Sequence, residues 1–380
     1  MKHILGIKRN MIKKLVYITY QTFPAETANS IQTISNIKYF VKNKTNVDLY
    51  FPLRERQSDG DISKLKNYYS FNENFNSFGV EHPYPHGKIK FLTSLWFHIS
   101  HFLWSKKVVK KINKEYEQDT YFITRSDWIA LFLAKKNRKI VFECHQTSKI
   151  RNLIIKIIKN KKNVKFIFLN NYLNMFYKNP SNGIVLHNAV DAELFENNIE
   201  AKQDNSIVFV GNISRFKKTR GLETIIKWFN ESEINRKFTI KIIGGPNKSL
   251  QVLNDIIKKN NLQNFVKVCG RLNRLETIKE IQKSSIGLLV NSDYNLHSLK
   301  YTSPLKYFEY LFGGLKIIAV NFPAHYELPF SENISFFNSE DKNSFIQALN
   351  NTEKKKVYNI NDLEEITLDV RIKKILKFIE

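Results

Sequence analysis

The sequence is poor in cysteine, in strong backbone breaks and in long apolar runs, and each shortage excludes a class of protein. Two cysteines in 380 residues exclude a disulfide scaffold and a multi-cysteine zinc site, and indicate a reducing cytoplasm. With 13 Gly, 9 Pro and 42% hydrophobic residues, the chain is neither collagen-like nor wholly disordered. The most apolar stretch, residues 89–104 (IKFLTSLWFHISHFLW), is short for a membrane span and contains Lys and His. The first 20 residues lack the apolar segment of a signal peptide, and Met11 is an alternative start.

Acidic residues are also scarce. Lys and Arg total 60 against 35 Asp and Glu, which gives a net charge of +25. Three interpretations compete: a compositional bias towards Lys and Asn, attraction to an anionic membrane surface, and nucleic-acid binding. Nucleic-acid binders favour Arg, which is sparse here, so we rank compositional bias first, the membrane second and nucleic acid last.

Apolar runs of strand length alternate with helical stretches along the whole chain, which predicts an α/β fold with parallel sheets covered by helices. In the first half the expected strands are 15–19, 47–51, 121–124, 140–143, 164–169 and 183–187. The pattern then restarts with expected strands at 206–210, 238–243, 266–269, 286–290 and 316–320. At 380 residues the chain is also long enough for two hydrophobic cores. We therefore predict two doubly wound, Rossmann-like domains that face each other across a cleft.

The domain boundaries follow from a polar, strandless stretch between the two series of strands. We assign residues 1–190 to a first domain, 191–205 to a linker and 206–362 to a second domain. The helical tail, 363–380, is expected to pack back on the first domain. Ligands of such folds bind at the carboxyl ends of the strands.

The segment around Pro304 combines several features of an anion site. Ser303 suits a helix N-cap and Pro304 the first helical position. The free N–H groups of that helix end and the charge of Lys306 would attract a phosphate. Glu309 follows within the same helix, facing either the cleft or the sheet. A capped core helix with a solvated Lys explains the same residues equally well.

Other strand ends carry further candidates. The loop 211–221 holds four cations between two glycines (GNISRFKKTRG), where backbone and charge could meet a diphosphate, although an ordinary basic loop is the alternative. Gly244-Gly245 and Gly270-Arg271 end the next two strands, as tight turns often do. His145 follows the strand 140–143 and suits hydrogen bonding or acid–base work, but a structural His is the commoner case.

Several motifs are missing. The sequence has no G-x-G-x-x-G after its first strand, no P-loop, no H-E-x-x-H and no G-x-S-x-G. The D-x-D at 59–61 has no strand before it and is interpreted as a surface turn. Nothing in the sequence requires a metal or another cofactor.

Taken together, these segments resemble the GT-B glycosyltransferases of family 4, over nearly the whole chain. The similar segments are PAETANSIQTISN, TRSDWIALFLAKKNRKIVFECH, VLHNAVDAELF, FVGNISRFKKTRG and, most specifically, YTSPLKYFEYLFGGLKIIAV. The resemblance implies a retaining, metal-independent transfer of a sugar from a UDP- or GDP-linked donor, with 206–362 as the donor-binding domain and 1–190 as the acceptor-side domain. If the first domain lies on a membrane surface, the expected acceptor is a cell-envelope glycan or a lipid-linked molecule.

The resemblance also implies roles for individual residues. Glu309 would bind the donor ribose, and His145 would lie near the reacting sugar; with Lys306 they form the catalytic set. The diphosphate would be held by Ser303, Lys306 and the loop cations Arg215, Lys217, Lys218 and Arg220. The base would lie near Arg271 and Leu272. The remaining donor contacts would be Gly211, Asn212, Gly244, Pro304 and Leu305.

Three positions depart from the family pattern. Tyr301 occupies the place of the first Glu of E-x7-E, Asn212 replaces a usual Arg, and Ala189 replaces a usual Gly. Two alternatives stay open. The change at Tyr301 favours a catalytically silent sugar-nucleotide-binding scaffold. A sugar-nucleotide epimerase of the same fold is the other, although the His- and Glu-rich signatures of that family are not evident.

Two segments of the first half suggest peripheral attachment to the inner face of the plasma membrane. Residues 149–166 are basic with Leu and Ile at helical spacing, and residues 94–114 combine aromatic side chains with a Lys cluster. Helices that cover a sheet with Lys on the wet side are the alternative, and we favour it modestly.

Overall fold

The computed structural model describes residues 12–55, 57–82, 93–195, 201–215, 218–231 and 234–380. The chain divides into two compact units. The first contains residues 1–168, 174–186 and 369–380, and the second contains residues 169–173 and 187–368. Apart from the short stretch 169–173, the chain changes unit at 186–187 and at 368–369.

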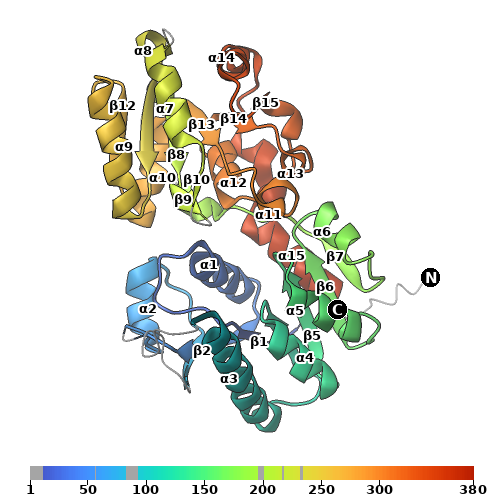
Figure 1. Cartoon of the computed structure of the whole chain (residues 1–380). Coiled ribbons are helices and arrows are strands. Elements are labelled where there is room, and N and C mark those ends of the chain that lie inside the picture. The colour runs from blue at the N-terminus through green and yellow to red at the C-terminus, as the bar shows by residue number, and fades with distance from the viewer. Residues whose placement is uncertain (1–11, 56, 83–92, 196–200, 216–217, 232–233) are drawn as a thin grey trace, which may run out of the picture. The chain divides into compact units, whose positions relative to one another are not determined.

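The first unit is built on a seven-stranded parallel sheet with the order β3-β2-β1-β4-β5-β6-β7 (Figure 1). Its strands are β1 (Lys14–Ile18), β2 (Asn46–Leu53), β3 (Asn76–Glu81), β4 (Tyr121–Thr124), β5 (Lys139–Cys144), β6 (Val164–Phe168) and β7 (Gly183–Val185). Its helices are α1 (Ala28–Lys42), α2 (Ile62–Tyr69), α3 (Thr93–Glu115), α4 (Asp127–Lys135), α5 (Lys149–Ile158) and α15 (Leu368–Ile379), and α6 (Asn171–Phe176) spans the boundary of the units. Buried central strands such as β1 and β5 are nearly continuous apolar runs, because helices cover both of their faces.

The second unit is built on a six-stranded parallel sheet with the order β12-β11-β8-β13-β14-β15. Its strands are β8 (Ser206–Val210), β11 (Thr239–Ile243), β12 (Val266–Gly270), β13 (Ile286–Leu289), β14 (Lys316–Val320) and β15 (Ile334–Phe337), and a small hairpin joins β9 (Ser214–Arg215) to β10 (Lys218–Thr219). Its main helices are α7 (Leu222–Glu231), α8 (Ile234–Lys237), α9 (Asn247–Lys259), α10 (Arg274–Lys283), α11 (Leu296–Lys300), α12 (Leu305–Phe312), α13 (Pro323–Tyr326) and α14 (Lys342–Asn351). The α/β fold class with two doubly wound sheets is confirmed.

Helix α12 is locked against the sheet by one aromatic side chain. The ring of Tyr310 lies on Gly287 of β13, where a Cβ would come within 2.4 Å of the ring. Its hydroxyl accepts a hydrogen bond from the N–H of Val210 (2.9 Å) and donates one to the carbonyl of Leu288 (3.4 Å). This bridge fixes the helix relative to the end of β8, and therefore fixes everything on its first turn.

The C-terminal helix α15 belongs to the first unit. The hydroxyl of Tyr121 donates to the carbonyl of Ile379, and Asn43 on the loop after α1 donates to Asp369 at 2.9 Å. Arg371 is buried and reaches Glu143 on β5. In the part of the chain that the structure describes, no helix is both long and apolar enough to span a membrane.

Candidate functional site

Glycines bring three neighbouring strand ends of the second unit into backbone contact. Gly211 follows β8 with φ +139°, and Gly244 follows β11 with φ +151°. A Cβ on Gly244 would lie 1.8 Å from the carbonyl oxygen of Gly211, so only glycine fits there. The N–H of Gly211 donates to Ile243 (2.9 Å) and that of Gly244 to Gly270 (2.7 Å). The sequence predicts that glycines matter at these strand ends, and at Gly244 the requirement is steric.

The basic loop after Gly211 forms the β9–β10 hairpin and returns to the strand end. The N–H of Arg220 donates to the carbonyl of Ile213 at 3.1 Å, and its Nη1 would lie 3.6 Å from a Cβ on Gly211. Arg220 is therefore the loop cation that the structure places at the end of β8. Asn212 is exposed. The side chains of the other three predicted cations, Arg215, Lys217 and Lys218, lie outside the described residues.

Helix α12 begins at Leu305, and Pro304 occupies its N-cap without a side-chain bond. The prediction that Ser303 caps this helix is wrong. Ser303 is buried, its Oγ accepts from the N–H of Asn188 at 3.0 Å, and its carbonyl accepts from the Asn188 side chain. Because the helix begins one residue later than predicted, Ser303 stands before the cap position, and its hydroxyl serves the N–H of Asn188 instead. Its predicted contact with a diphosphate stays a prediction.

Lys306, on the first turn of α12, extends to the same strand end as Arg220. Its Nζ lies 4.2 Å from the ring centroid of Phe209 on β8 and is shielded from solvent. The tip of that ring would be 3.9 Å from a Cβ on Gly211. Two cations therefore lie near the end of β8: Arg220 beside Gly211, and Lys306 against the ring of Phe209.

The charge of Lys306 also affects the pKa of a buried histidine that sequence reasoning missed. His325 on α13 has Nδ1 2.8 Å from the carbonyl of Val320, which fixes its proton on that nitrogen. Burial, and then the charge of Lys306, lower the pKa of His325 to about 4, against the opposing effect of the Val320 carbonyl. The imidazole is consequently neutral near pH 7.

Glu309 is buried and forms an ion pair with Arg274, whose Nη2 lies 2.6 Å from Oε1. Arg274 is the first residue of α10, and Asn273 and Glu276 form a capping box around it. We did not single out Arg274 from the sequence, although N-x-x-E at 273–276 is a recognisable helix start.

The two residues that were expected near a base lie just before α10. A Cβ on Gly245 would come within 2.8 Å of Nε of the exposed Arg271. Leu272 packs against the hydrophobic cluster that contains Tyr307 and Leu311. Tyr301, in the position of the missing Glu, is buried at the end of α11.

In the first unit, His145 lies beside a buried carboxylate. Because side chains alternate along a strand, Glu143 and His145 share one face of β5 and its extension, and His145 Nε2 lies 3.7 Å from Glu143 Oε2. Tyr17 donates to that oxygen at 3.1 Å and Arg125 Nε at 2.9 Å, while Arg371 Nη2 donates to Oε1 at 2.9 Å. Sequence reasoning found His145 and missed the network around it.

The ionisation of this network follows from burial and charge. Burial alone would raise the pKa of Glu143, but Arg125 and Arg371 outweigh it and hold that pKa well below its usual range. For His145, burial and then the charge of Arg125 lower the pKa to about 3, although Glu143 opposes the shift. The group is thus an ionised carboxylate, two guanidiniums and a neutral imidazole.

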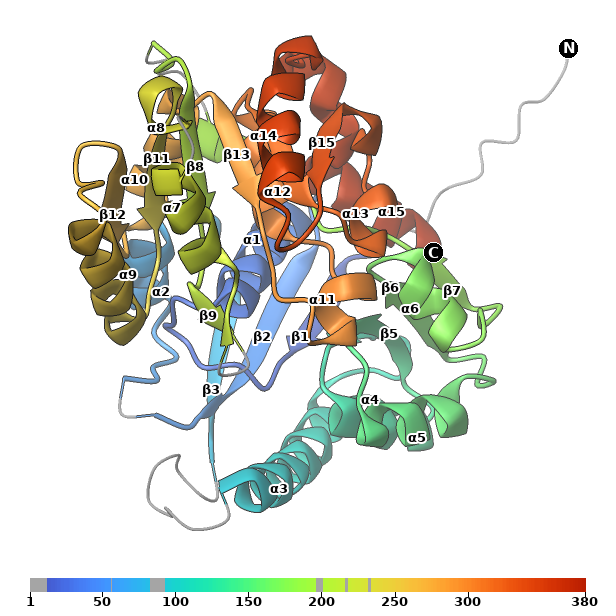
Figure 2. The same ribbon diagram turned by 45° about the horizontal axis from the view of Figure 1, so that its top comes forward.

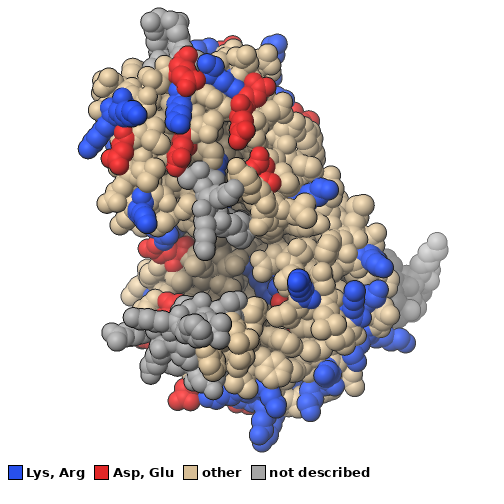
Figure 3. Space-filling view, viewed as in Figure 1, with Lys and Arg blue, Asp and Glu red and all other residues tan. Residues whose placement is uncertain are grey.

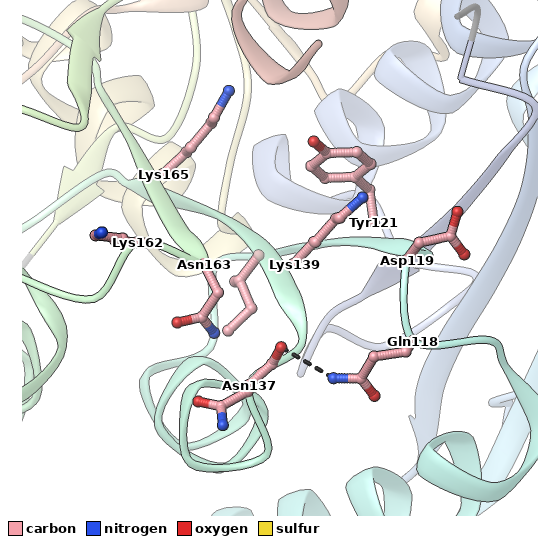
Figure 4. A pocket seen from close by; sticks show the side chains of 9 residues that line it. Gln118, Asp119, Tyr121, Asn137, Lys139, Lys162, Asn163 and Lys165 are labelled. Carbon is pink, nitrogen blue, oxygen red and sulfur yellow. Dashed lines mark hydrogen bonds between the residues drawn. The ribbon is translucent and has the colours of Figure 1, made fainter.

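One cavity lies at the amino ends of strands in the first sheet. It has a volume of about 430 Å³, and Figure 4 shows Lys139, Lys162 and Lys165 around it. The lining residues lie at or just before the amino ends of β4, β5 and β6, whereas His145 follows the carboxyl end of β5. This cavity therefore contains none of the predicted site residues. Within the described ranges, no three His, Cys, Asp or Glu side chains come together as metal ligands.

Two α/β units, each built on a parallel sheet, are the architecture of the GT-B fold. Solved structures of that fold match the chain over nearly its whole length. The glycosyltransferase from Rickettsia africae ESF-5 has a TM-score of 0.66 and 15% identity, covering 98% of each chain. HepE from Anabaena, solved in complex with UDP and glucose, has a TM-score of 0.63 and 13% identity, covering 96% of this chain and 98% of its own. WaaG, a glycosyltransferase involved in lipopolysaccharide biosynthesis, has a TM-score of 0.61 and 11% identity, covering 96% of this chain and 99% of its own.

At these identities the likeness establishes the GT-B fold. No protein-family model matches the sequence, and no curated protein matches it either.

Proposed function

We propose that this chain is a glycosyltransferase that moves a sugar from a UDP- or GDP-linked donor to a glycan or lipid-linked acceptor, with retention of configuration and without a metal. The observation that carries the proposal is that Arg220, beside Gly211, and Lys306, against Phe209, both lie near the end of β8. The fold supports it, since solved glycosyltransferases share it.

The chemistry required is stabilisation of a leaving diphosphate. Negative charge develops on the diphosphate as the bond to the sugar breaks, and fixed donors at that position lower the barrier. Lys306 and Arg220 supply two positive charges, and the N–H groups of Leu305 and Lys306 open α12. The Lys306 ammonium rests against the Phe209 ring and would exchange that contact for a phosphate oxygen. Glu309, held by Arg274, would accept from ribose hydroxyls.

Calorimetric titration of the full chain with UDP and GDP tests this proposal. We expect Lys306→Met and Arg220→Met each to weaken binding about tenfold, because each removes a charge-assisted contact to phosphate. Lys279→Met is the matched control, since Lys279 is an exposed lysine on α10, and we expect it to bind normally. Failure of both diphosphates to bind the unmodified chain would contradict the donor assignment.

Tyr301 keeps a scaffold as a second candidate. A chain that binds nucleotide sugars without turnover or transfer in the presence of envelope glycan or lipid-linked acceptors would be a binding protein. Release of UDP or GDP that Glu309→Gln reduces would support the enzyme, as would isotope transfer from donor to acceptor.

We also propose that the first unit attaches to an anionic membrane surface through α5. Its outer face carries Leu153 (60% exposed) and Ile157 (48% exposed), with Lys149 and Lys156 beside them. Helices α3, α4 and α5 lie side by side (Figure 2), and α5 has no acidic residue. Apolar side chains flanked by lysines suit a bilayer with anionic headgroups.

A further inference from the structure

We propose that Arg125 and His145 form a binding site for an oxyanion, a phosphate or carboxylate group carried by the acceptor. That the acceptor carries the group rests on the proposed function, but the existence of the site does not. The inference comes from two buried nitrogen atoms and from an excess of positive charge around Glu143.

Arg125 uses only part of its guanidinium. Its Nε donates to Glu143 at 2.9 Å and its Nη1 to Gln32 on α1 at 3.1 Å. Its Nη2 is buried and has no hydrogen-bond partner among the residues that the structure describes, and the side chain is only 9% exposed. A buried, charged donor without an acceptor is unfavourable, and proteins keep such groups where a ligand or water completes them.

His145 supplies a second nitrogen near Oε2, the same carboxylate oxygen that Arg125 binds. Its Nε2, 3.7 Å from Glu143 Oε2, is also buried and without a hydrogen-bond partner in the described part of the chain. The side chain as a whole is 16% exposed. With its proton on Nε2, the neutral ring donates to an oxyanion.

The charge balance selects an anion rather than a neutral hydroxyl. One carboxylate, Glu143, faces two guanidiniums, Arg125 and Arg371, and the imidazole of His145 is neutral. Asp127, the acidic residue that comes before Glu143 in the sequence, is paired with Arg151 at 2.6 Å. A positive charge therefore remains beside the two open nitrogens, and an oxyanion neutralises it.

Arg151 provides an internal control. It is a buried arginine of the same unit whose three nitrogens all have partners: Asp127 (2.6 Å), the carbonyl of Gln146 (3.0 Å) and the carbonyl of Arg125 (3.1 Å). It shares the burial and chain region of Arg125 but has no nitrogen left for a ligand.

The test is a titration of the full chain, labelled with ¹⁵N-arginine, with inorganic phosphate and separately with acetate, while the side-chain Nε–H signals are recorded. We expect the Arg125 signal to shift and saturate and the Arg151 signal to stay in place. Saturation by phosphate alone identifies a phosphate group on the natural ligand, and saturation by acetate alone identifies a carboxylate.

Two variants separate the site from the fold. Arg125→Met removes the guanidinium group. His145→Phe keeps an aromatic ring and leaves the Glu143–arginine pairs in place. We expect His145→Phe to weaken anion binding about tenfold, for loss of one hydrogen bond to a charged group. The proposal would be overturned if neither anion shifts the Arg125 signal, or if the Arg125 and Arg151 signals drift in parallel. Water would then be the hydrogen-bond partner of the two buried nitrogens. Since no nucleotide is used, this result is independent of donor binding.

Discussion

Single residues decide the geometry of both sites, and Gly244 does so most strictly. Its φ of +151° and the 1.8 Å approach of Gly211 to its would-be Cβ leave no room for a side chain. The contact joins the end of β11 to the end of β8, where Arg220 lies beside Gly211 and Lys306 lies against Phe209. A change at this position acts on the site through the backbone.

We predict that Gly244→Ala lowers the free energy of unfolding by about 3 kcal/mol or more, from backbone strain and forced separation of two strand ends. Gly221→Ala is the matched control: its φ is +81°, but nothing lies within 4 Å of its would-be Cβ. We expect the control to lose about 1–2 kcal/mol from strain alone. Equal losses in urea unfolding would show that the steric argument is wrong.

Histidines that are buried or half-buried govern the response of the fold to acid. Burial lowers the pKa of His101 and of His145 to about 3, and that of His325 to about 4. The unfolded chain binds these protons near pH 6.5, whereas the folded chain stays neutral until much lower pH. Protons therefore favour the unfolded state, and stability falls as the pH drops from about 6.5 towards 4.

We predict that His325→Leu makes the pH dependence shallower between about pH 6.5 and 4.5, by up to about 1.4 kcal/mol per pH unit, since one proton uptake is removed. The exposed His98 is the control, and His98→Leu should keep the slope of the unmodified chain. Unfolding free energies measured at several pH values give the slope, and an unchanged slope for His325→Leu would mean that this side chain titrates normally.

At the scale of elements, α15 connects residues that are far apart in the sequence into one hydrogen-bonded network. Arg371 on this helix reaches Glu143 on β5, 228 positions earlier in the chain. The helix thus helps to hold the carboxylate on which Arg125 and His145 depend.

We predict that Arg371→Met destabilises the chain by about 3–5 kcal/mol, because it breaks a buried ion pair from one side. Lys373→Met, on the same helix, is the control: Lys373 is 61% exposed and pairs with Asp369 at 2.5 Å. An exposed pair contributes about 1 kcal/mol or less. Denaturant unfolding distinguishes the two, and similar effects would place Glu143 in a wetter environment than its burial indicates.

At the scale of the whole molecule, the charge of +25 is the dominant property. Figure 3 shows Lys and Arg on the face drawn there, with acidic side chains gathered mainly over the second unit. A surface of this sign attracts anionic bilayers and is screened by salt.

We predict that the full chain sediments with phosphatidylglycerol vesicles at low salt and less with phosphatidylcholine vesicles. Leu153→Ser combined with Ile157→Ser should reduce the bound fraction, because the apolar contact is lost while the charge is kept. The control is Val252→Ser combined with Leu275→Ser, two exposed apolar residues of the second unit. Equal sedimentation of both double variants would contradict a docking face on α5.

The sequence alone determined the fold class and most of the sheet, because buried parallel strands are apolar runs that local composition reveals. It missed β3 and β15, each at one edge of its sheet, and the short α11. Position after a strand was also enough to single out Gly211, Gly244 and His145, and position in the first turn of a helix singled out Lys306.

Only the tertiary structure decided which partners those residues have. Ser303 binds Asn188 instead of capping its helix, Arg274 pairs with Glu309, and Arg371 reaches Glu143. Each of these contacts joins segments from different elements of a unit. Their pairing depends on distances across the packed sheet, and the spacing of residues along the chain carries no record of such distances.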